Sequence, residues 1–490
     1  MSRSSRGVLS LVVLVAAVLD CGRQQAAAQP LLVLQKPTPT ADDQFGYSVA
    51  GVGSNLAVGA PYDDTGGADA GAVYVFDPAG VLLQTLQKAV PVAGDLFGYA
   101  VAAVGSNVLV GAPNDDTGAT DAGAAYVFDS TGILILTIPN PSPATGDEFG
   151  AAVAAVGTNI LVGARSKDSG AVDAGAAYLF DGTTGALLQT FSNPTPALND
   201  QFGYSVAAVG TNILVGAPND DTGKSNAGAA YLFNPGGTLL QTFQKPLRAV
   251  NDQFGWSVAG LGANVLVGVP FDDTGAKDSG AVYLFDGVSG LLLTTFANPN
   301  PAMGDWFGFS LATVGTNVLV GTRFDDTVTT DAGAAYLFDG TTAALLQTFT
   351  APAPTIGSEL GFSVAAAGVD VLAGAHFDST AAAHAGTAFV FGVCGNGILE
   401  TGEQCDLPVD AACPGLCGPP APGSGCQCMA SPTPTATVTP TSTQTPTSTP
   451  TPTNTPTPTN TPTSPFGLLM IGALGVGLLW ALRRFAQPSA

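Results

Sequence analysis

Adjacent aspartates recur at regular intervals along this chain and are the residues best suited to binding a cation. Five Asp-Asp-Thr motifs supply them: Asp63 and Asp64, Asp115 and Asp116, Asp220 and Asp221, Asp272 and Asp273, and Asp325 and Asp326. Carboxylate oxygens are preferred ligands of Ca²⁺, so each pair is a candidate divalent-cation site. Aspartate also caps tight turns by accepting hydrogen bonds from the backbone two residues on. Both interpretations stay open; the sequence requires no cofactor, and Ca²⁺ is the cation that the pairs would suit.

The pairs belong to a repeat that occurs seven times between residues 43 and 391, with a period of 52 or 53 residues. Each unit opens on Phe-Gly, except that Leu-Gly stands in the seventh: Phe45, Phe97, Phe149, Phe202, Phe254, Phe307 and Leu360. In the fourth unit, four short β-type runs begin at Tyr204, Asn212, Ala229 and Thr238, separated by turn-forming residues. Four strands per unit is typical of a propeller blade, so the sequence predicts an all-β, seven-bladed β-propeller over residues 30–393.

The two ends of the repeat array complement each other. The seventh unit reaches Cys394 without a fourth run, whereas the segment from Leu31 to Pro37 matches the fourth run of an earlier unit, Leu239 to Pro246. We expect residues 31–36 to form the outer strand of the blade that contains residues 361–391. Such a strand would close the ring and leave no gap between the first and last blades.

The repeat resembles the FG-GAP family, on the evidence of Phe202-Gly203 and Gly216-Ala217-Pro218. Its best-known members form the seven-bladed head of integrin alpha subunits, so the resemblance implies a propeller. For function it implies less, because members serve adhesion and ligand binding and some accompany enzymes. Several integrin blades carry an Asp-x-Asp-x-Asp-Gly calcium loop between the first and second strands. Here that loop is Val209-Gly210-Thr211-Asn212, so the family's calcium sites are not carried over.

Acidic residues dominate the charge of the propeller. Residues 31–393 contain 32 Asp and Glu against nine Lys and Arg. Of these carboxylates, 26 lie in the loops before Phe-Gly or in the Asp-Asp-Thr loops, which would emerge on one face of the ring. A face of this charge repels nucleic acid, which excludes DNA and RNA as partners, and it favours a cationic or cation-bridged ligand.

Two units break the acidic pattern. The third carries Arg165 and Lys167 in a loop that reads Pro-Asn-Asp-Asp in other units, and the sixth carries Arg323 in place of the proline. Aromatic residues such as Tyr204 and Trp256 follow Phe-Gly at the start of the innermost strand. These five residues predict a ligand-binding side for an extracellular protein or glycan. The alternatives are substitution in a tolerant loop for the cations and blade-to-blade packing for the aromatics.

Catalysis finds little support in the sequence. The chain has two histidines, His376 and His384, and neither Gly-x-Ser-x-Gly nor His-Glu-x-x-His occurs. We therefore expect a protein that is not an enzyme. One competing hypothesis is a hydrolase or lyase that acts on an extracellular polymer through the rim carboxylates, which would show one blade with clustered, perturbed carboxyl groups. The other is a structural envelope component without a discrete ligand.

The N-terminus predicts export. Arg3 and Arg6 precede an apolar run from Val8 to Leu19, which is typical of a signal peptide, assigned here to residues 1–28. Cys21 suggests a lipid anchor as an alternative, but Asp20 before it disfavours that interpretation.

Six cysteines follow the propeller and predict a disulfide-rich module over residues 394–428. An even number in an exported chain favours three disulfides, with the pairing open. The opening segment from Cys394 to Asp406 resembles the cysteine-rich repeat of surface proteins from myxobacteria and related lineages. A metal site is disfavoured because no histidine is near. The cysteines are Cys394, Cys405, Cys413, Cys417, Cys426 and Cys428.

The C-terminal part predicts display at a membrane. Residues 429–465 are rich in Thr and Pro and predict a disordered, extended stalk. Residues 466–482 are apolar and long enough for a short transmembrane helix, and Arg483-Arg484 would keep the tail 483–490 in the cytoplasm. A cleaved sorting signal is the alternative to this anchor. Together the segments predict a cell-surface recognition or adhesion protein with its propeller outside the cytoplasm.

Overall fold

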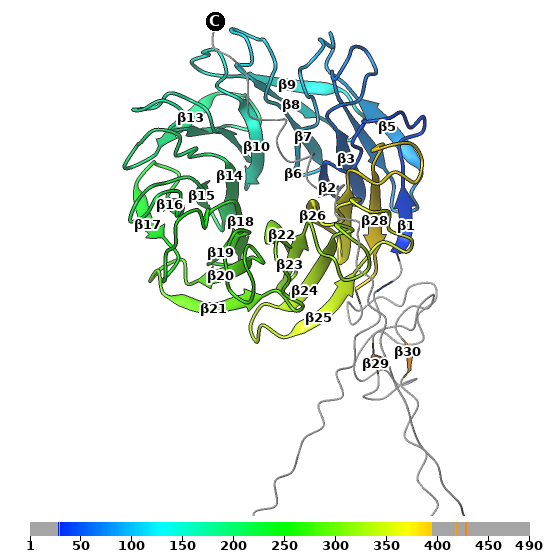
Figure 1. Cartoon of the computed structure of the whole chain (residues 1–490). Coiled ribbons are helices and arrows are strands. Elements are labelled where there is room, and N and C mark those ends of the chain that lie inside the picture. Colours follow the sequence, from blue (N-terminus) through cyan, green and yellow to red (C-terminus); the bar gives the residue numbers. More distant parts are fainter. Residues whose placement is uncertain (1–27, 29, 394–416, 419–426, 429–490) are drawn as a thin grey trace, which may run out of the picture. The chain divides into compact units, whose positions relative to one another are not determined.

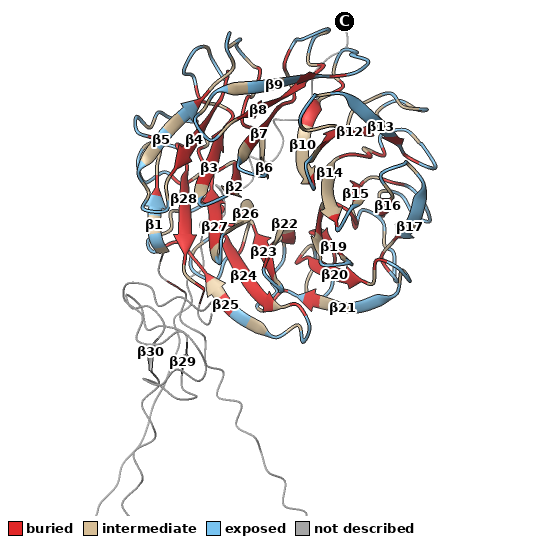
Figure 2. Cartoon of the chain, turned by 180° about the vertical axis from the view of Figure 1, so that it is seen from behind, coloured by how far each residue is buried: buried red, intermediate tan, exposed pale blue. Residues whose placement is uncertain are grey.

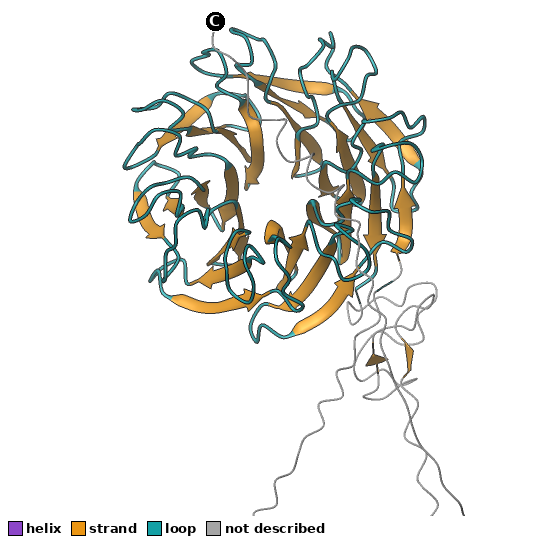
Figure 3. Cartoon of the chain, in the orientation of Figure 1, coloured by secondary structure: helices purple, strands orange, loops and turns teal. Residues whose placement is uncertain are grey.

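The computed structural model describes residue 28 and residues 30–393, 417–418 and 427–428. Every regular element in these residues is a strand, and residues 30–391 form seven four-stranded antiparallel sheets (Figure 3). The sheets follow one another around a ring, each with its first strand innermost (Figure 1). The predicted seven-bladed propeller is confirmed for this part of the chain.

The blades follow the order of the repeat. Blade 1 consists of β2 (Ser48–Val52), β3 (Asn55–Ala60), β4 (Ala72–Phe76) and β5 (Leu82–Leu86); blade 2 of β6 (Ala100–Val104), β7 (Asn107–Ala112), β8 (Ala124–Phe128) and β9 (Leu134–Pro139); blade 3 of β10 (Phe149–Val156), β11 (Asn159–Ala164), β12 (Ala176–Phe180) and β13 (Leu187–Ser192). Blade 4 consists of β14 (Ser205–Val209), β15 (Asn212–Ala217), β16 (Ala229–Phe233) and β17 (Leu239–Phe243); blade 5 of β18 (Ser257–Leu261), β19 (Asn264–Val269), β20 (Ala281–Phe285) and β21 (Leu292–Ala297). Blade 6 consists of β22 (Phe307–Val314), β23 (Asn317–Thr322), β24 (Ala334–Asp339) and β25 (Leu345–Phe349), and blade 7 of β26 (Ser363–Ala367), β27 (Asp370–Ala375), β28 (Thr387–Phe391) and β1 (Pro30–Leu34).

Residue type follows the depth of each strand in its blade. The third strand is buried on both faces, as in β16 (Ala-Ala-Tyr-Leu-Phe), and so is nearly all of the second strand. Such strands read as continuous apolar runs rather than as alternating ones. The outermost strand meets solvent, and its side chains are largely exposed or half-buried, as in β5 (Figure 2).

The N-terminal strand completes blade 7. β1 pairs antiparallel with β28, with Leu32 opposite Val390 and Leu34 opposite Ala388. The two segments lie side by side although they come from opposite ends of the ring (Figure 1). The prediction that the N-terminus supplies the missing outer strand is confirmed, with the strand at Pro30–Leu34 rather than at 31–36.

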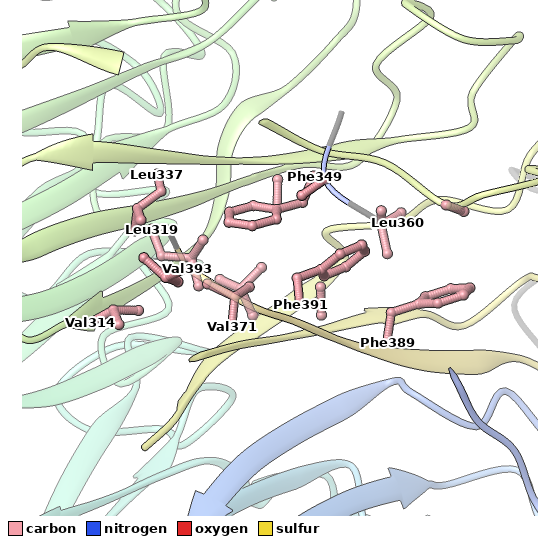
Figure 4. Close-up of a cluster of buried hydrophobic side chains, with 14 of the residues drawn as sticks. Val314, Leu319, Leu337, Phe349, Leu360, Val371, Phe389, Phe391 and Val393 are labelled. Carbon is pink, nitrogen blue, oxygen red and sulfur yellow. The ribbon is translucent and has the colours of Figure 1, made fainter. Parts of the chain in front are cut away.

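The core of the ring lies between blades. Seven clusters of buried apolar residues each combine residues from neighbouring sheets. In the cluster of Figure 4, Leu337 and Phe349 of blade 6 lie with Val371 and Phe391 of blade 7. A blade therefore buries its faces only by stacking on its neighbours, and closing the ring removes the two free faces that an open array would expose.

Phe-Gly joins one blade to the preceding one. Phe202 is fully buried against Tyr231 and Phe233 of its own blade, and its amide donates to Ala174 O of blade 3 over 2.9 Å. Gly203 has φ +92°, and a Cβ there would lie 2.3 Å from Ala176 O. Only glycine fits this close backbone contact, which explains why the dipeptide recurs.

Several predicted segments lie outside the described residues. These are most of the signal peptide, the stalk, the span at 466–482, the tail and most of the cysteine-rich module. Within that module, the short strands β29 (Cys417–Gly418) and β30 (Gln427–Cys428) pair, with Cys417 opposite Cys428. No helix of the described residues is long and apolar enough to cross a membrane. Ala28 is buried and donates its amide to Thr348 O over 3.0 Å, so a signal cleavage that keeps this contact would fall before residue 28.

Candidate ligand-binding rim and its buried ion sets

Two kinds of loop interleave on one face of the ring. The loop before each Phe-Gly lies against the loop between the second and third strands of the preceding blade. For example, Leu96 N donates to Asp69 O over 3.2 Å and Phe97 N donates to Ala70 O over 3.1 Å. The acidic loops therefore share one face, as predicted, and we call it the rim face.

The first aspartate of each pair is buried. Asp220 Oδ2 accepts a hydrogen bond of 2.5 Å from the Tyr231 hydroxyl, and Asp220 Oδ1 accepts one of 2.7 Å from Thr222 N. Burial and the carboxylate raise the pKa of Tyr231 far above its usual range, so the hydroxyl stays a donor. The same contact to a tyrosine of the third strand recurs at Asp63, Asp115, Asp272 and Asp325.

The second aspartate of each pair is exposed and caps its loop. Asp221 Oδ1 accepts a hydrogen bond of 2.8 Å from Asn226 N, and Asn226 has φ +48°. Asp64, Asp116, Asp273 and Asp326 do the same for the residue five positions on. Turn capping thus accounts for both carboxylates of a pair, which bind different partners. In the described part of the chain, no group of three or more His, Cys, Asp or Glu is arranged to hold a metal, and cation binding by the adjacent pairs stays a prediction.

The buried aspartates belong to a recurring ion set. In each blade the set has three positions. The first two lie nine and two residues before the Phe of Phe-Gly, and the third is the first residue of the Asp-Asp motif. In blade 5, Lys245 Nζ lies 3.2 Å from Asp252 Oδ2 and 2.9 Å from Asp272 Oδ2. Lysine joins two carboxylates in the same way in blade 1 (Lys36, Asp43, Asp63) and blade 2 (Lys88, Asp95, Asp115).

In blade 3 the lysine occupies a different position of the set. Asn140 stands in the usual lysine position, while Lys167 replaces the buried aspartate and lies 3.0 Å from Asp147 Oδ2. Lys167, which was predicted to mark a ligand side, lies in this ion pair with 14% of its side chain exposed, and a role toward a ligand stays a prediction.

Blades 4 and 6 keep both carboxylates without a lysine. In blade 4, Asn193 Nδ2 donates to Asp200 Oδ2 over 2.7 Å, and Asp220 completes the set. Burial and the neighbouring carboxylates Asp220 and Asp221 raise the pKa of Asp200 to about 6. Blade 6 has Asn298, Asp305 and Asp325, and burial and Asp325 likewise raise the pKa of Asp305.

Six aromatic side chains form a collar at the mouth of the central channel. They line a cavity of about 260 Å³ together with neighbouring residues of the innermost strands. Adjacent rings touch, with centroids 4.8 Å apart for Tyr204 and Trp256 and 5.1 Å apart for Phe309 and Phe362. The collar consists of Tyr47, Tyr99, Tyr204, Trp256, Phe309 and Phe362. The rings pack between blades, as the packing interpretation predicts, and they also line a cavity, while ligand binding there stays a prediction.

Arg165 fills the one gap in the collar. Blade 3 has Ala151 at the collar position, and the Arg165 guanidinium carbon lies 5.6 Å from the Tyr99 ring centroid and 5.5 Å from that of Tyr204. Its Nε donates to Glu148. The predicted Arg165, Tyr204 and Trp256 thus lie together at the channel mouth.

A second aromatic cluster adjoins the collar at blades 5 and 6, and the sequence analysis missed it. We call Trp256, Phe271, Trp306 and Phe324 the aromatic patch; all are half-buried, and Trp306 lies 4.7 Å from both Phe271 and Phe324 between ring centroids. Arg323, which was predicted, stacks 4.6 Å from the Phe324 centroid and 5.7 Å from that of Trp306. Comparing units could have found it, because Trp306 stands where other units have Gln, Glu or Leu.

Blade 7 adds a second unpredicted feature. His376 is buried with its Nδ1 unpaired, and its ring lies 3.8 Å from Phe362 and 4.0 Å from Phe377 between centroids. Burial and the positive charge of Arg323 hold the pKa of His376 well below its usual range. Its Nε2 lies 3.7 Å from Glu359, a carboxylate that Arg323 binds over 2.6 Å.

The geometry defines a seven-bladed β-propeller with aromatic side chains around its channel mouth. The sequence profile of the FG-GAP repeat matches six segments: residues 39–76, 86–128, 141–180, 196–233, 248–285 and 296–338. The chain belongs to the FG-GAP repeat family, and blade 7, with Leu360 in place of phenylalanine, lies outside the matched segments. A comparison with curated proteins gave no match.

Proposed function

We propose that this protein is a cell-surface recognition or adhesion protein that binds an extracellular protein or glycan through the aromatic patch and the collar. The family supports the class of function, since FG-GAP propellers are typical of extracellular ligand-binding domains. The patch supports the location.

The aromatic patch carries the proposal. Trp306 keeps a half-buried indole between Phe271 and Phe324. Its φ of +59° is shared by the equivalent residues of the other units, from +53° at Gln44 to +59° at Glu359, so the side chain and not the backbone sets blade 6 apart. Half-exposed tryptophan and arginine are also the residue types that dominate binding energy at recognition surfaces.

The proposal is for binding without catalysis. A hydrolase or lyase would need a perturbed carboxyl within reach of its polymer, and the carboxyl with the clearest shift, Asp200, is 1% exposed. The exposed second aspartates of the rim pairs accept hydrogen bonds from the backbone of their own loops in one blade after another. Nucleic acid is not proposed as a partner, because the rim carboxylates would repel it.

Export and membrane attachment complete the proposal. The signal peptide, disulfide-rich module, stalk and span predicted from the sequence would place the propeller outside the cytoplasm. A chain that ends at Ser464 should be released into the medium, whereas the full chain should stay with the membrane fraction. Equal release of both would contradict a permanent anchor at residues 466–482.

The binding proposal is tested with the full-length chain on glycan and protein arrays, beside two matched variants. Trp306→Gln gives blade 6 the residue that Gln201 and Gln253 supply at the same position, so the fold should tolerate it. Leu96→Gln introduces glutamine at the equivalent position of blade 2, where φ is +55°. We expect a ligand that Trp306→Gln weakens at least about tenfold and Leu96→Gln leaves unchanged, because losing a hot-spot aromatic costs about 2 kcal/mol or more. Equal binding by both variants would contradict the patch as the site.

A further inference from the structure

Blade 5 shows how a complete ion set divides the two oxygens of its buried aspartate. Asp272 Oδ1 accepts a hydrogen bond of 2.7 Å from Thr274 N, within its own loop. Asp272 Oδ2 accepts one of 2.6 Å from the Tyr283 hydroxyl and lies 2.9 Å from Lys245 Nζ. Blades 1 and 2 divide the oxygens in the same way. Oδ1 therefore fixes the loop, and Oδ2 is the oxygen that binds the ammonium.

Blade 7 keeps the carboxylate and lacks both donors to Oδ2. Asp378 Oδ1 accepts hydrogen bonds from Thr380 N over 2.9 Å and from the Thr387 hydroxyl over 3.1 Å. Where blade 5 has its lysine and its tyrosine, blade 7 has Ala351 and Phe389. Asp378 is 2% exposed, and its Oδ2 accepts no hydrogen bond from the residues that the structure describes. An unpaired carboxylate oxygen at a buried position is costly, so this set lacks a donor.

The missing side chains leave a cavity at this place. Asp378, Ala351 and Phe389 line a space of about 160 Å³. Val33 and Pro352 also line it and are exposed, so a ligand can reach the cavity from solvent beside β1. Sites for drug-sized ligands measure about 300–1,000 Å³, so this smaller cavity suits a single unbranched chain.

A hydroxyl of the same set has also lost its partners. In blade 1, Thr40 Oγ1 donates to Asp43 Oδ1 over 2.7 Å and accepts from Lys36 Nζ over 3.5 Å. Thr355 stands at the equivalent position of blade 7, where Ser358 replaces the aspartate and no lysine is present in the set. Thr355 Oγ1 is buried and has no hydrogen-bond partner among the described residues. Two unpaired oxygens, in different residues, thus mark the place that an ammonium occupies in blade 1.

We propose that this cavity binds a primary alkylammonium group, supplied by a lysine side chain of another protein or by a free amine. The ammonium binds Asp378 Oδ2, as Lys245 binds Asp272 Oδ2 within blade 5, and its methylene groups pack on apolar walls. Arginine is disfavoured, because its planar fork pairs with both oxygens of a carboxylate and Oδ1 is already bound.

The surroundings favour a cation. The cavity lies among the loops of the rim face, whose many carboxylates attract positive charge and raise the rate of encounter with it. The proposal does not depend on the aromatic patch, which lies at blades 5 and 6, so either can fail without the other.

The experiment titrates the full-length chain with n-butylammonium, whose chain matches the four-carbon stem of lysine, and follows binding by saturation-transfer NMR. We expect a dissociation constant of about 1 mM, as suits so few atoms, and no detectable binding of the neutral 1-butanol. Ala351→Lys supplies the residue that blades 1, 2 and 5 carry, so its own ammonium should fill the cavity and weaken binding at least about tenfold. Asp378→Asn removes the charge and should weaken binding as much.

The control is Asp77→Asn, which removes one exposed carboxylate outside the cavity. Asn234 stands at the equivalent position of blade 4, so the fold should tolerate the change and binding should stay the same. Thermal melts supply a second readout: n-butylammonium should raise the Tm of the unaltered chain and of Asp77→Asn but not that of Ala351→Lys.

A competition arm separates the two sources of the ammonium. The peptide acetyl-Ala-Lys-Ala-amide and its counterpart with Nε-acetyl-lysine are each added to the complex with n-butylammonium. Displacement by the first peptide alone assigns the cavity to lysine side chains, and displacement by neither assigns it to free amines. Displacement by both would contradict recognition of the charge. The proposal is overturned if the unaltered chain binds n-butylammonium no better than 1-butanol, or if Ala351→Lys binds it as tightly as the unaltered chain does.

Discussion

Blades 5 and 7 share the same four-strand ladder but are held together differently. Blade 5 is continuous in sequence and carries the full ion set of Lys245, Asp252 and Asp272, with the Tyr283 hydroxyl on Asp272 over 2.6 Å. Blade 7 is assembled from both ends of the ring and has Ala351, Ser358 and Phe389 at the equivalent positions. Of the charged groups it keeps only Asp378.

The difference teaches that the ion set is not needed to build a blade. In blade 7 the buried Ser358 donates to Ala332 O over 3.1 Å, and Asp378 accepts from Thr380 N and from the Thr387 hydroxyl. Strand register in the two sheets is equivalent, with the second-strand residues Val265 and Val371 opposite Phe285 and Phe391. Apolar clusters between blades and backbone ladders therefore suffice to build blade 7, which predicts that the polar set can be exchanged as a unit.

The largest expected effect comes from removing the strand that closes blade 7. Deleting residues 30–34 exposes the edge of β28 and removes the buried Leu34 while keeping Lys36 for the ion set of blade 1. We expect the Tm to fall by about 10 °C or more, since several kcal/mol of pairing and burial are lost. The control changes the exposed side chains Leu31 and Val33 to Ser and keeps the backbone ladder. If the deletion lowers the Tm no more than this control does, the stability of the ring does not depend on the pairing of β1 with β28.

The next effect concerns the ion set of blade 5. Lys245→Met leaves Asp252 and Asp272 buried without their cation, and breaking a buried ion pair by removing one partner costs about 3–5 kcal/mol. Replacing the set as a unit, with Lys245→Ala, Asp252→Ser and Tyr283→Phe, gives blade 5 the residues of blade 7. If the set is exchangeable, the triple variant should be more stable than Lys245→Met in denaturant unfolding. A triple variant whose loss equals or exceeds that of the single change would contradict exchange as a unit.

A smaller effect isolates the tyrosine hydroxyl. Tyr283→Phe removes one donor to the buried Asp272 and should cost about 1–3 kcal/mol, because the carboxylate loses a hydrogen bond that water cannot replace. Tyr178→Phe in blade 3 is the matched control, since residue 167 there is lysine and offers no carboxylate to the hydroxyl. Chemical denaturation should separate the two variants; equal losses would mean that the tyrosine contributes only through its ring.

The sequence predicted the ring well because the features that build it are local and repeated. The recurrence of Phe-Gly, as at Phe202-Gly203, predicts the number of blades, and the turn residues predict where the strands end. The missing fourth run of blade 7 predicts that the N-terminal strand pairs with β28. The site was predicted less well. Nothing in the pair Asp220-Asp221 shows that one carboxylate is buried and the other caps a loop, because that depends on a tyrosine of the next strand. Lys167 and the aromatic patch depend on contacts between blades, which the order of residues within a unit does not reveal.

The smallest expected effect is a pH dependence that blade 7 has and blade 5 lacks. His376 takes the place of Pro270 and is buried, and burial and Arg323 hold its pKa well below the ordinary value. Below about pH 6.5 the imidazole is protonated in the unfolded chain but stays neutral in the folded ring. The free energy of unfolding therefore decreases as pH falls below about 6.5, by at most about 1.4 kcal/mol per pH unit. His376→Phe keeps an aromatic ring in the stack and should reduce the loss of Tm between pH 7 and pH 5. If His376→Phe follows the pH profile of the unaltered chain, acid lability comes from the carboxylates of the other blades and not from the one buried imidazole among the described residues.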